Sequence, residues 1–257
     1  MPRIVMTSWN VNSIRQRAEH LGRLLAEKSP DVLLLQETKV EDSAFPAGPI
    51  ADLGYEVLTS GQKTWNGVAI ASRIPLVDPS ESLPNGYTTT EKRILAATVS
   101  GIRLVNVYVP NGGSSAESFS GKLRFLDAML ASFIGGDPGG RVLLAGDFNV
   151  APREDDVYDP VALDGEVCFH PDERARMEAM FQAGAVDLFR RFTPGGKAYS
   201  WWDYRQLGFQ KNRGMRLDHF IASPALAAHA AACTIDREPR KWKKPSDHAP
   251  VTAVFEI

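Results

Sequence analysis

Polar side chains capable of catalytic or ligating chemistry follow, or lie close to, several apolar runs that are typical of β-strands. They are Asn10 and Asn12 after the run 4–9, Glu37 after 32–36, Asp147 and Asn149 after 142–146, Asp218 within 214–220, and Asp247 and His248 before 251–257. A site built across the edge of a sheet needs polar groups at the ends of strands. We therefore expect these residues to share one cleft.

Glu37 follows directly after a run that reads as a buried strand, where a lone carboxylate is costly unless a positive charge meets it. A divalent cation is a natural partner for such a group. With Asn10 and Asp247 the site would offer only oxygen ligands, and the thiol or multiple-histidine set preferred by zinc is missing. We expect Mg²⁺, for which Mn²⁺ can substitute. A salt bridge from Glu37 to Lys39 is the alternative.

A series of short motifs spans nearly the whole chain. In order, they are SWNVNSIR at 8–15, LQETK at 35–39, VYVPNG at 107–112, GDFNVAP at 146–152, NRGMRLD at 212–218 and SDHAP at 246–250. Each motif occurs by chance in other proteins, whereas the ordered set is specific. The set resembles the signatures of the exonuclease III family of abasic-site endonucleases, within the endonuclease/exonuclease/phosphatase superfamily.

This resemblance implies a DNA repair nuclease that hydrolyses the phosphodiester 5′ to abasic sites in duplex DNA by metal-assisted attack of water. It also implies trimming of blocked 3′ ends and a 3′–5′ exonuclease activity. The fold that it implies is a four-layer α/β/β/α sandwich of two packed mixed sheets flanked by helices. We expect one catalytic domain over residues 1–257, because the candidate site draws on both ends of the chain.

Phosphodiester hydrolysis needs a water aimed in line, neutralisation of charge on the phosphoryl oxygens and help for the leaving alkoxide. His248 needs an orienting acid other than Asp247, because adjacent residues of an extended chain point to opposite faces. The resemblance implies that Asp218 is this acid. It further implies that Asn149 holds the phosphate and that Asp147 moves a proton. Whether Asp147 takes the proton from water or gives one to the leaving oxygen stays open.

Tyr108 and Asn111 match positions where the family contacts the phosphate, with Tyr108 as a catalytic phenol donor. Taken singly, a core tyrosine and an asparagine in a turn before glycine are the alternatives. The resemblance places Trp201, Met215 and Leu217 around an apolar recess that suits an extruded sugar without its base. The residues expected to contact substrate are Asn12, Asn111, Trp201, Met215, Arg216 and Leu217.

The periodicity of the sequence predicts the elements that must position these groups. Helices are expected from Asn12 or Ser13 to Lys28, with a capping box at Ser13, from 122 to 133 with Gly135 and Gly136 at its end, and from 171 to 184. Strands are expected at 32–36, 56–59, 68–72, 95–100, 103–109, 142–145, 199–204, 216–222, 234–237 and 251–255. The polar stretch 114–120 is expected to be a mobile loop, and Trp202 a core residue.

The composition, with 44% hydrophobic and 23% charged residues, is that of a globular protein with a sizeable core. The apolar runs are too short for a membrane span, and the N-terminus lacks the pattern of a signal peptide. Cys168 and Cys233 have no ligand spacing and are expected to be reduced thiols of a cytoplasmic protein, for which a disulfide is the alternative. We expect a monomer that acts on double-stranded DNA containing abasic sites or blocked 3′ ends.

The formal net charge of −2 does not by itself indicate nucleic-acid binding, but basic residues cluster before two of the candidate acids. The clusters are Arg205, Lys211, Arg213 and Arg216 before Asp218, and Arg237, Arg240, Lys241, Lys243 and Lys244 before Asp247. We interpret them as a phosphate-facing rim, for which solvated loops are the alternative.

Two other functions fit the same scaffold. Members of the wider superfamily act on phosphoinositides, sphingomyelin or RNA, and a catalytically silent nucleic-acid-binding regulator is the second alternative. The stretch WWDYR at 201–205 together with NRG at 212–214 favours DNA. The presence of Glu37, Asp147, Asn149, Asp218 and His248 argues against a silent regulator.

Overall fold

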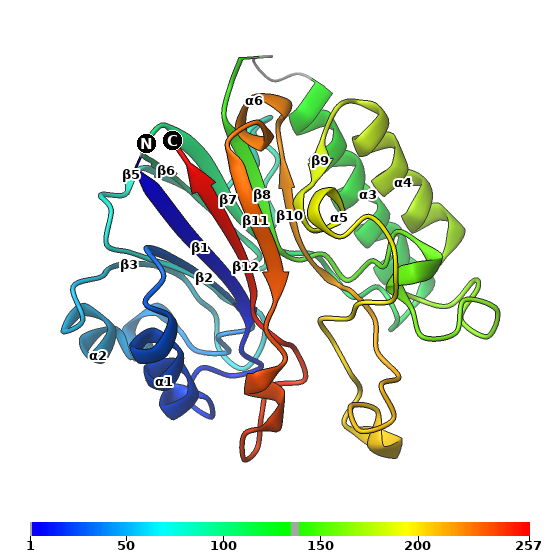
Figure 1. The fold of residues 1–257 in the computed structure, drawn as a ribbon, viewed down its shortest axis with the longest axis horizontal. Coiled ribbons are helices and arrows are strands. Elements are labelled where there is room, and N and C mark those ends of the chain that lie inside the picture. Colours follow the sequence, from blue (N-terminus) through cyan, green and yellow to red (C-terminus); the bar gives the residue numbers. More distant parts are fainter. Residues whose placement is uncertain (1, 135–138) are drawn as a thin grey trace.

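The computed structural model describes residues 2–134 and 139–257, and within them two six-stranded sheets pack face to face (Figure 1). The first sheet contains, in spatial order, β11 (Ala230–Ile235), β12 (Val251–Glu256), β1 (Arg3–Asn10), β2 (Val32–Gln36), β4 (Val68–Ser72) and β3 (Glu56–Ser60). The second contains β5 (Val77–Ser80), β6 (Ile94–Val99), β7 (Ile102–Tyr108), β8 (Val142–Asp147), β10 (Asp218–Ala222) and β9 (Val186–Asp187).

Helices cover the outer faces of both sheets (Figure 1). They are α1 (Ala18–Lys28) and α2 (Ala47–Ala51) beside the first sheet, α3 (Ala116–Ile134) and α4 (Pro171–Gln182) beside the second, and the short α5 (Leu188–Phe192) and α6 (Pro224–Ala227). Single 3₁₀ turns lie at Asp42–Ala44, Glu154–Asp156, Arg205–Leu207 and Glu238–Lys241. The predicted four-layer α/β/β/α sandwich is confirmed.

Three apolar clusters hold these layers together. One lies between the sheets and joins residues such as Leu34 and Val68 to Leu104 and Phe220. A second packs the outer face of the second sheet against α3 and α4, and a third packs the outer face of the first sheet against α1. Strands β2, β4 and β10 are therefore buried along their whole length, and for β2 and β4 the apolar runs in the sequence already indicate this.

The strand directions bring the candidate residues to one edge of the sandwich. Strand β1 is parallel to β2, and β7 is parallel to β8, so each pair ends together. Strand β10 is antiparallel to β8, and β12 is antiparallel to β1, so these strands begin where the others end. The register pairs Asn10 with Gln36, and Asp147 with both Tyr108 and Asp218.

Several predicted boundaries are wrong. Helix α1 begins at Ala18 without a side-chain cap, because Asn12 and Ser13 have positive φ values of 44° and 87° and belong to a turn. Helix α3 begins at Ala116 and takes in most of the stretch predicted as a mobile loop. The segment 199–204 is no strand and makes only isolated bridges, through Trp201. Strand β11 ends at Ile235, short of the predicted 237.

Other local predictions hold. Helix α4 starts at Pro171, and His170 and Glu173 form its capping box. The predicted strands 95–100 and 103–109 correspond to the antiparallel strands β6 and β7, and the chain turns between them at Ser100 and Gly101. The predicted helix end at Gly135 and Gly136 lies outside the described residues. Across residues 2–134 and 139–257, none of the helices has the length and apolar character needed to cross a membrane.

Candidate active site

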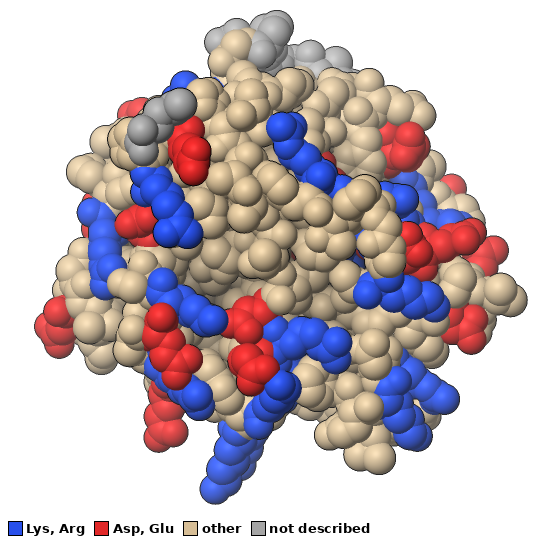
Figure 2. Space-filling model, in the orientation of Figure 1, with Lys and Arg blue, Asp and Glu red and all other residues tan. Residues whose placement is uncertain are grey.

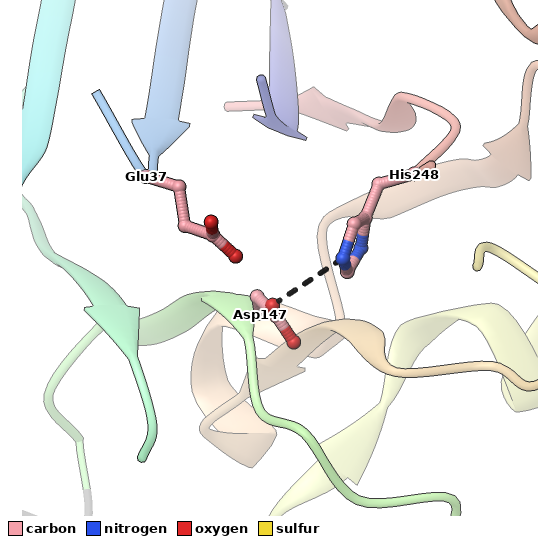
Figure 3. Close-up of side chains that lie close together, drawn as sticks. All are labelled: Glu37, Asp147 and His248. Atoms are coloured by element: carbon pink, nitrogen blue, oxygen red, sulfur yellow. Dashed lines mark ion pairs between the residues drawn. The ribbon is translucent and has the colours of Figure 1, made fainter. Parts of the chain in front are cut away.

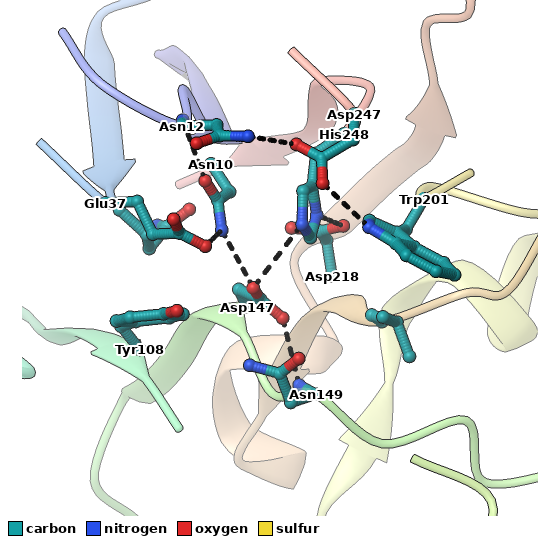
Figure 4. A network of polar contacts seen from close by, with 12 residues as sticks. Asn10, Asn12, Glu37, Tyr108, Asp147, Asn149, Trp201, Asp218, Asp247 and His248 are labelled. Carbon is teal, nitrogen blue, oxygen red and sulfur yellow. Dashed lines mark hydrogen bonds and ion pairs between the residues drawn. The ribbon is translucent and has the colours of Figure 1, made fainter. Parts of the chain in front are cut away.

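The candidate residues from both sheets meet in one polar network (Figure 4). Asn10 is buried at the end of β1, and its Nδ2 donates to Glu37 Oε1 over 2.8 Å and to Asp147 Oδ2 over 2.9 Å. Its Oδ1 accepts from the backbone N–H of Asn12 over 3.0 Å. In this orientation Asn10 joins the two carboxylates as a donor, and its predicted role as an oxygen ligand of a metal stays a prediction.

Glu37, Asp147 and His248 form a compact cluster, with one potential ligand atom of each within 4.8 Å of the others (Figure 3). Asp147 is 1% exposed and His248 4%, whereas Glu37 is partly exposed. Lys39 Nζ lies 2.8 Å from Glu37 Oε2, so the alternative salt bridge is present. Since Glu37 Oε1 faces the cluster through Asn10, the two contacts use different oxygens.

Asp247 lies at the edge of this cluster, with both carboxylate oxygens bonded to neighbours. Oδ1 accepts from Asn12 Nδ2 over 2.9 Å, and Oδ2 accepts from Trp201 Nε1 over 3.0 Å. Burial has the largest single effect on the pKa of Asp247 and raises it. The charge of His248 and these two hydrogen bonds together outweigh burial, so the pKa lies below its ordinary value. Asp247 is therefore an anion, and its predicted role as a metal ligand stays a prediction.

His248 and Asp218 form a buried pair. His248 Nδ1 lies 2.9 Å from Asp218 Oδ2, and Nε2 faces Asp147 Oδ2 at 3.6 Å. Burial lowers the pKa of His248, but the charges of Asp218 and Asp147 outweigh it and raise the pKa to about 10. The imidazole is therefore protonated at neutral pH, so that Nε2–H points toward Asp147.

The backbone around this pair is fixed by neighbouring side chains. Trp9 Nε1 donates to the carbonyl of His248 over 3.1 Å, and Ser246 Oγ accepts from its N–H over 3.2 Å. Ser200 Oγ accepts from the N–H groups of Leu217 and Asp218, each over 3.0 Å. The role of Ser200 could not be predicted from the sequence, because a serine next to two tryptophans gives no signal of a contact with Leu217 and Asp218.

Asp147 ends β8, and Asn149 lies in the turn that follows it. Gly146 has φ of +141°, and a Cβ there would lie 2.0 Å from the carbonyl oxygen of Val107, so only glycine lets β8 approach β7 this closely. Asn149 has φ of 51°, and its N–H donates to Asp147 Oδ1 over 2.9 Å. Burial, together with the charges of Asp218 and Glu37, raises the pKa of Asp147 to about 7, against the opposing effect of His248.

Tyr108 and Asn111 lie on the other side of Asp147. Tyr108 ends β7, and burial, with added repulsion from Glu37 and Asp147, raises the pKa of its phenol well above the ordinary value. The phenol is therefore neutral and able to donate. Asn111 Nδ2 donates to Asn149 Oδ1 over 3.3 Å, which places both amides at the same side of the cluster.

An apolar wall borders the polar network. Met215 and Leu217 belong to one buried cluster against which Trp201 packs, and the backbones of Trp201 and Met215 exchange two hydrogen bonds of 2.9 Å. The indole of Trp201 reaches Asp247, so the wall adjoins the polar groups (Figure 4). Trp202 is fully buried, as expected of a core residue.

Arg216 is not at the site, and its predicted contact with substrate is wrong. Its side chain is 0% exposed and forms ion pairs with Asp156 at 2.6 Å and Asp187 at 2.7 Å. Successive side chains of an extended segment point to opposite faces, so Arg216 points away from the wall formed by its two neighbours. It therefore stabilises the interior and does not belong to the basic rim.

The basic clusters are only partly available to a ligand. Arg240 is buried and donates to the carbonyls of Ser246 and Trp202. Arg205 and Lys241 are exposed but form ion pairs with nearby acids. Within residues 2–134 and 139–257, the exposed members whose side chains form neither an ion pair nor a hydrogen bond are Lys211, Arg213, Lys243 and Lys244. Figure 2 shows one face of the molecule, with basic side chains along its lower part and acidic side chains between them.

Carboxylates and a charged Asp–His pair converge at the shared edge of the two packed sheets. These are groups that phosphate ester hydrolysis requires. The fold and the site thus define a hydrolase. The sequence matches the Endonuclease/Exonuclease/phosphatase family over residues 7–248. The chain belongs to this family.

Similar proteins cover almost the whole chain. Exodeoxyribonuclease III of Haemophilus influenzae is 34% identical over 96% of this chain and 98% of its own, and DNA repair nuclease APEX1 of Danio rerio is 30% identical over 98% and 82%. An AP endonuclease from Archaeoglobus fulgidus superimposes with a TM-score of 0.92 at 37% identity, covering 99% of this chain and all of the other. The 3′–5′ exonuclease NExo from Neisseria meningitidis gives a TM-score of 0.93 at 39% identity, with the same coverage.

Proposed function

We propose that this enzyme is a DNA repair nuclease that hydrolyses the phosphodiester 5′ to abasic sites in duplex DNA, with 3′-end trimming and 3′–5′ exonuclease activity. The observation that carries the proposal is the meeting of Glu37, Asp147 and the His248–Asp218 pair beside an apolar wall. The names of the similar proteins, which include exodeoxyribonuclease III and AP endonuclease, support it.

In this proposal His248 stabilises negative charge on the phosphoryl group. Its imidazolium is held by Asp218 and presents Nε2–H toward the side of the network where Asp147 lies. Asp147 moves the proton: with a pKa of about 7 it is able either to accept a proton from water or to give one to the leaving oxygen. Asn149, Asn111 and the neutral phenol of Tyr108 hold the phosphate by donation.

The metal of this proposal is Mg²⁺, with Mn²⁺ as a substitute, held by Glu37 together with Asn10 and Asp247 or with Asp147. The residues fit such an ion, because the carboxylates of the network outnumber its cationic groups, and the excess of negative charge contributes to the raised pKa of Asp147. A bound Mg²⁺ would neutralise charge on the phosphoryl oxygens and promote the nucleophilic water.

The substrate of this proposal is a sugar without its base. Trp201, Met215 and Leu217 provide apolar surface next to the network, and a deoxyribose extruded from the duplex would place its 5′ phosphate against His248 and Asn149. An intact nucleotide must also break stacking and pairing, which costs a few kcal/mol and favours abasic sites by roughly a hundredfold. Exposed lysines such as Lys243 and Lys244 would contact the flanking backbone.

We further propose that residues 1–257 form one catalytic domain that acts as a monomer in the cytoplasm. Cys168 and Cys233 are both free and buried, and burial raises the pKa of the Cys168 thiol to about 12. Unreactive thiols of this kind are compatible with a reducing compartment.

The test is incision of a duplex with one internal abasic-site analogue, compared with the same duplex in which the base is intact. We expect a single cut at the 5′ side of the analogue, leaving a 3′ hydroxyl, at a rate at least about a hundredfold above that of any internal intact position. Equal cutting of both duplexes would indicate a general nuclease. Binding without any cleavage in Mg²⁺ would indicate a silent regulator.

A further inference from the structure

A charged pair without access to solvent lies between α3 and α4. Lys122 Nζ lies 2.6 Å from Glu173 Oε1, and both side chains are 0% exposed. Burying two charges is expensive, and well-packed apolar residues of similar volume would hold two helices together as well or better. Helix packing alone therefore does not account for an ammonium group at this position.

Lys122 connects the pair to the active site. Its Nζ donates to the carbonyl oxygen of Asn149 over 2.7 Å and to that of Asn111 over 3.0 Å. Asn111 follows β7 and Asn149 follows β8, so one ammonium group holds together the two loops that leave the second sheet beside the cluster. The side chains of the same two residues also meet, with Asn111 Nδ2 donating to Asn149 Oδ1.

The stem of Lys122 supports the same loop. Gly112 has φ of +85°, and a Cβ at this position would lie 3.0 Å from Lys122 Cδ and 3.3 Å from Lys122 Cβ. The backbone after Asn111 therefore rests directly on the methylene groups of Lys122. The ammonium group and the methylene groups of Lys122 together fix the path of the loop.

Glu173 has a different task in the pair. Its Oε2 accepts from the N–H of His170 over 3.2 Å as part of the cap of α4. Its Oε1 faces Lys122 at ion-pair distance, outside the geometry of a hydrogen bond. Glu173 thus supplies the opposite charge that lets the ammonium be buried, while the directed hydrogen bonds of Lys122 go to the two loops.

We propose that Lys122 is a positioning residue that sets the spacing of Asn111 and Asn149 for the phosphate, with Glu173 as its counter-ion. The inference rests on the proposed function, because it assigns these two amides to phosphate binding. Lys122 itself touches no substrate: it is fully buried and acts through the two loop carbonyls.

Two substitutions separate positioning from stability. Lys122→Met keeps most of the stem but removes both hydrogen bonds. We therefore expect kcat for abasic incision to fall by about 10- to 100-fold, which is the effect typical of lost support for a ligating group. The change in KM should be smaller. Glu173→Gln keeps the hydrogen bonds of Lys122 and an acceptor for the cap, so we expect kcat within about twofold of wild type and a lower Tm. Activity is measured well below each Tm, with the folded fraction determined by circular dichroism.

A second α3–α4 ion pair gives the matched control. Arg176 Nε lies 2.8 Å from Asp127 Oδ1, and this pair is partly exposed and does not touch the loops. Arg176→Met should leave kcat and KM unchanged. The proposal is overturned if folded Lys122→Met cuts abasic DNA with the wild-type kcat, or if Glu173→Gln loses as much kcat as Lys122→Met. Failure of the wild-type protein to cut abasic DNA would instead overturn the proposed function.

Discussion

Replacing Asp218 by Asn tests the charged pair at the centre of the site. The substitution keeps the shape of the side chain but removes the charge that faces His248 Nδ1 at 2.9 Å. A hydrogen bond to a charged group contributes about 1.5–3 kcal/mol, which corresponds to a loss of roughly 10- to 100-fold in rate if it acts in the transition state. We expect kcat for abasic incision to fall by this factor.

The pH dependence should change as well. Asp218 and Asp147 raise the pKa of His248 to about 10, and the protonated form is then present throughout the neutral range. Without the charge of Asp218 the pKa of His248 falls, so the imidazolium is lost at lower pH and the alkaline decline of kcat/KM moves to lower pH. The assay is single-turnover incision of an abasic duplex, measured between about pH 6 and 10.

A double-mutant cycle decides whether the two residues act as one unit. If they do, Asp218→Asn combined with His248→Gln should cost little more than His248→Gln alone. His219→Gln is the control, because His219 follows Asp218 on β10 but contacts Arg216 and Val150 instead of the site. Losses that multiply in the double variant, or an unchanged alkaline limb in Asp218→Asn, would show that the two residues do not work as a pair.

Three further predictions concern the rim, the apolar wall and the interior. Replacing Lys243 and Lys244 by Gln should weaken DNA binding and reduce the slope of log K against log salt by about one for each phosphate that a lysine neutralises. An unchanged slope would show that the two lysines contact solvent and not DNA. Trp201→Ala should slow abasic incision by about tenfold or more. Trp201→Phe keeps an aromatic side chain but lacks the hydrogen bond to Asp247, and it should retain most activity. Equal losses in the two variants would assign the effect to the hydrogen bond. Burial, with Arg216 nearby, lowers the pKa of His219 to about 4. The unfolded chain therefore binds a proton at His219 from about pH 6.5 downward, whereas the folded chain does not. The stabilisation of about 3 kcal/mol that is present above pH 6.5 is lost as the pH falls to 4. Urea unfolding should show this loss in wild type and a smaller one in His219→Gln, and identical pH profiles would contradict the assignment.

The sequence predicted the fold because an ordered set of motifs resembles a known family, and local patterns predicted most of the strands that carry the candidate residues. Central strands such as β2 and β4 are continuous apolar runs, and polar residues follow them directly. Once parallel and antiparallel neighbours are arranged in two sheets, the end of β8 and the start of β10 meet at one edge. The resemblance implies that Asp218 orients His248, and in the structure His248 Nδ1 lies 2.9 Å from Asp218 Oδ2.

The errors arise where long-range contacts override local patterns. Ser13 looks like a helix cap, but its N–H donates to the carbonyl of Glu37 over 2.8 Å, and this contact holds it in a turn. Arg216 looks like part of a basic patch, but two acids from distant segments, Asp156 and Asp187, bury it. The burial of Lys122 could not be predicted, because a single lysine in an amphipathic helix normally faces solvent.

Metal-assisted hydrolysis at this site is tested most directly by the Mg²⁺ dependence of abasic-site incision by wild type and Glu37→Ala. We predict no cutting by either protein in EDTA, full activity of wild type at low Mg²⁺, and a large loss in Glu37→Ala that high Mg²⁺ or Mn²⁺ partly restores, because mass action refills a weakened site. Lys39→Met is the control for the salt bridge to Glu37, and should leave the Mg²⁺ requirement in place. Full incision in EDTA, or a Glu37→Ala variant with the Mg²⁺ curve of wild type, would contradict a metal held by Glu37.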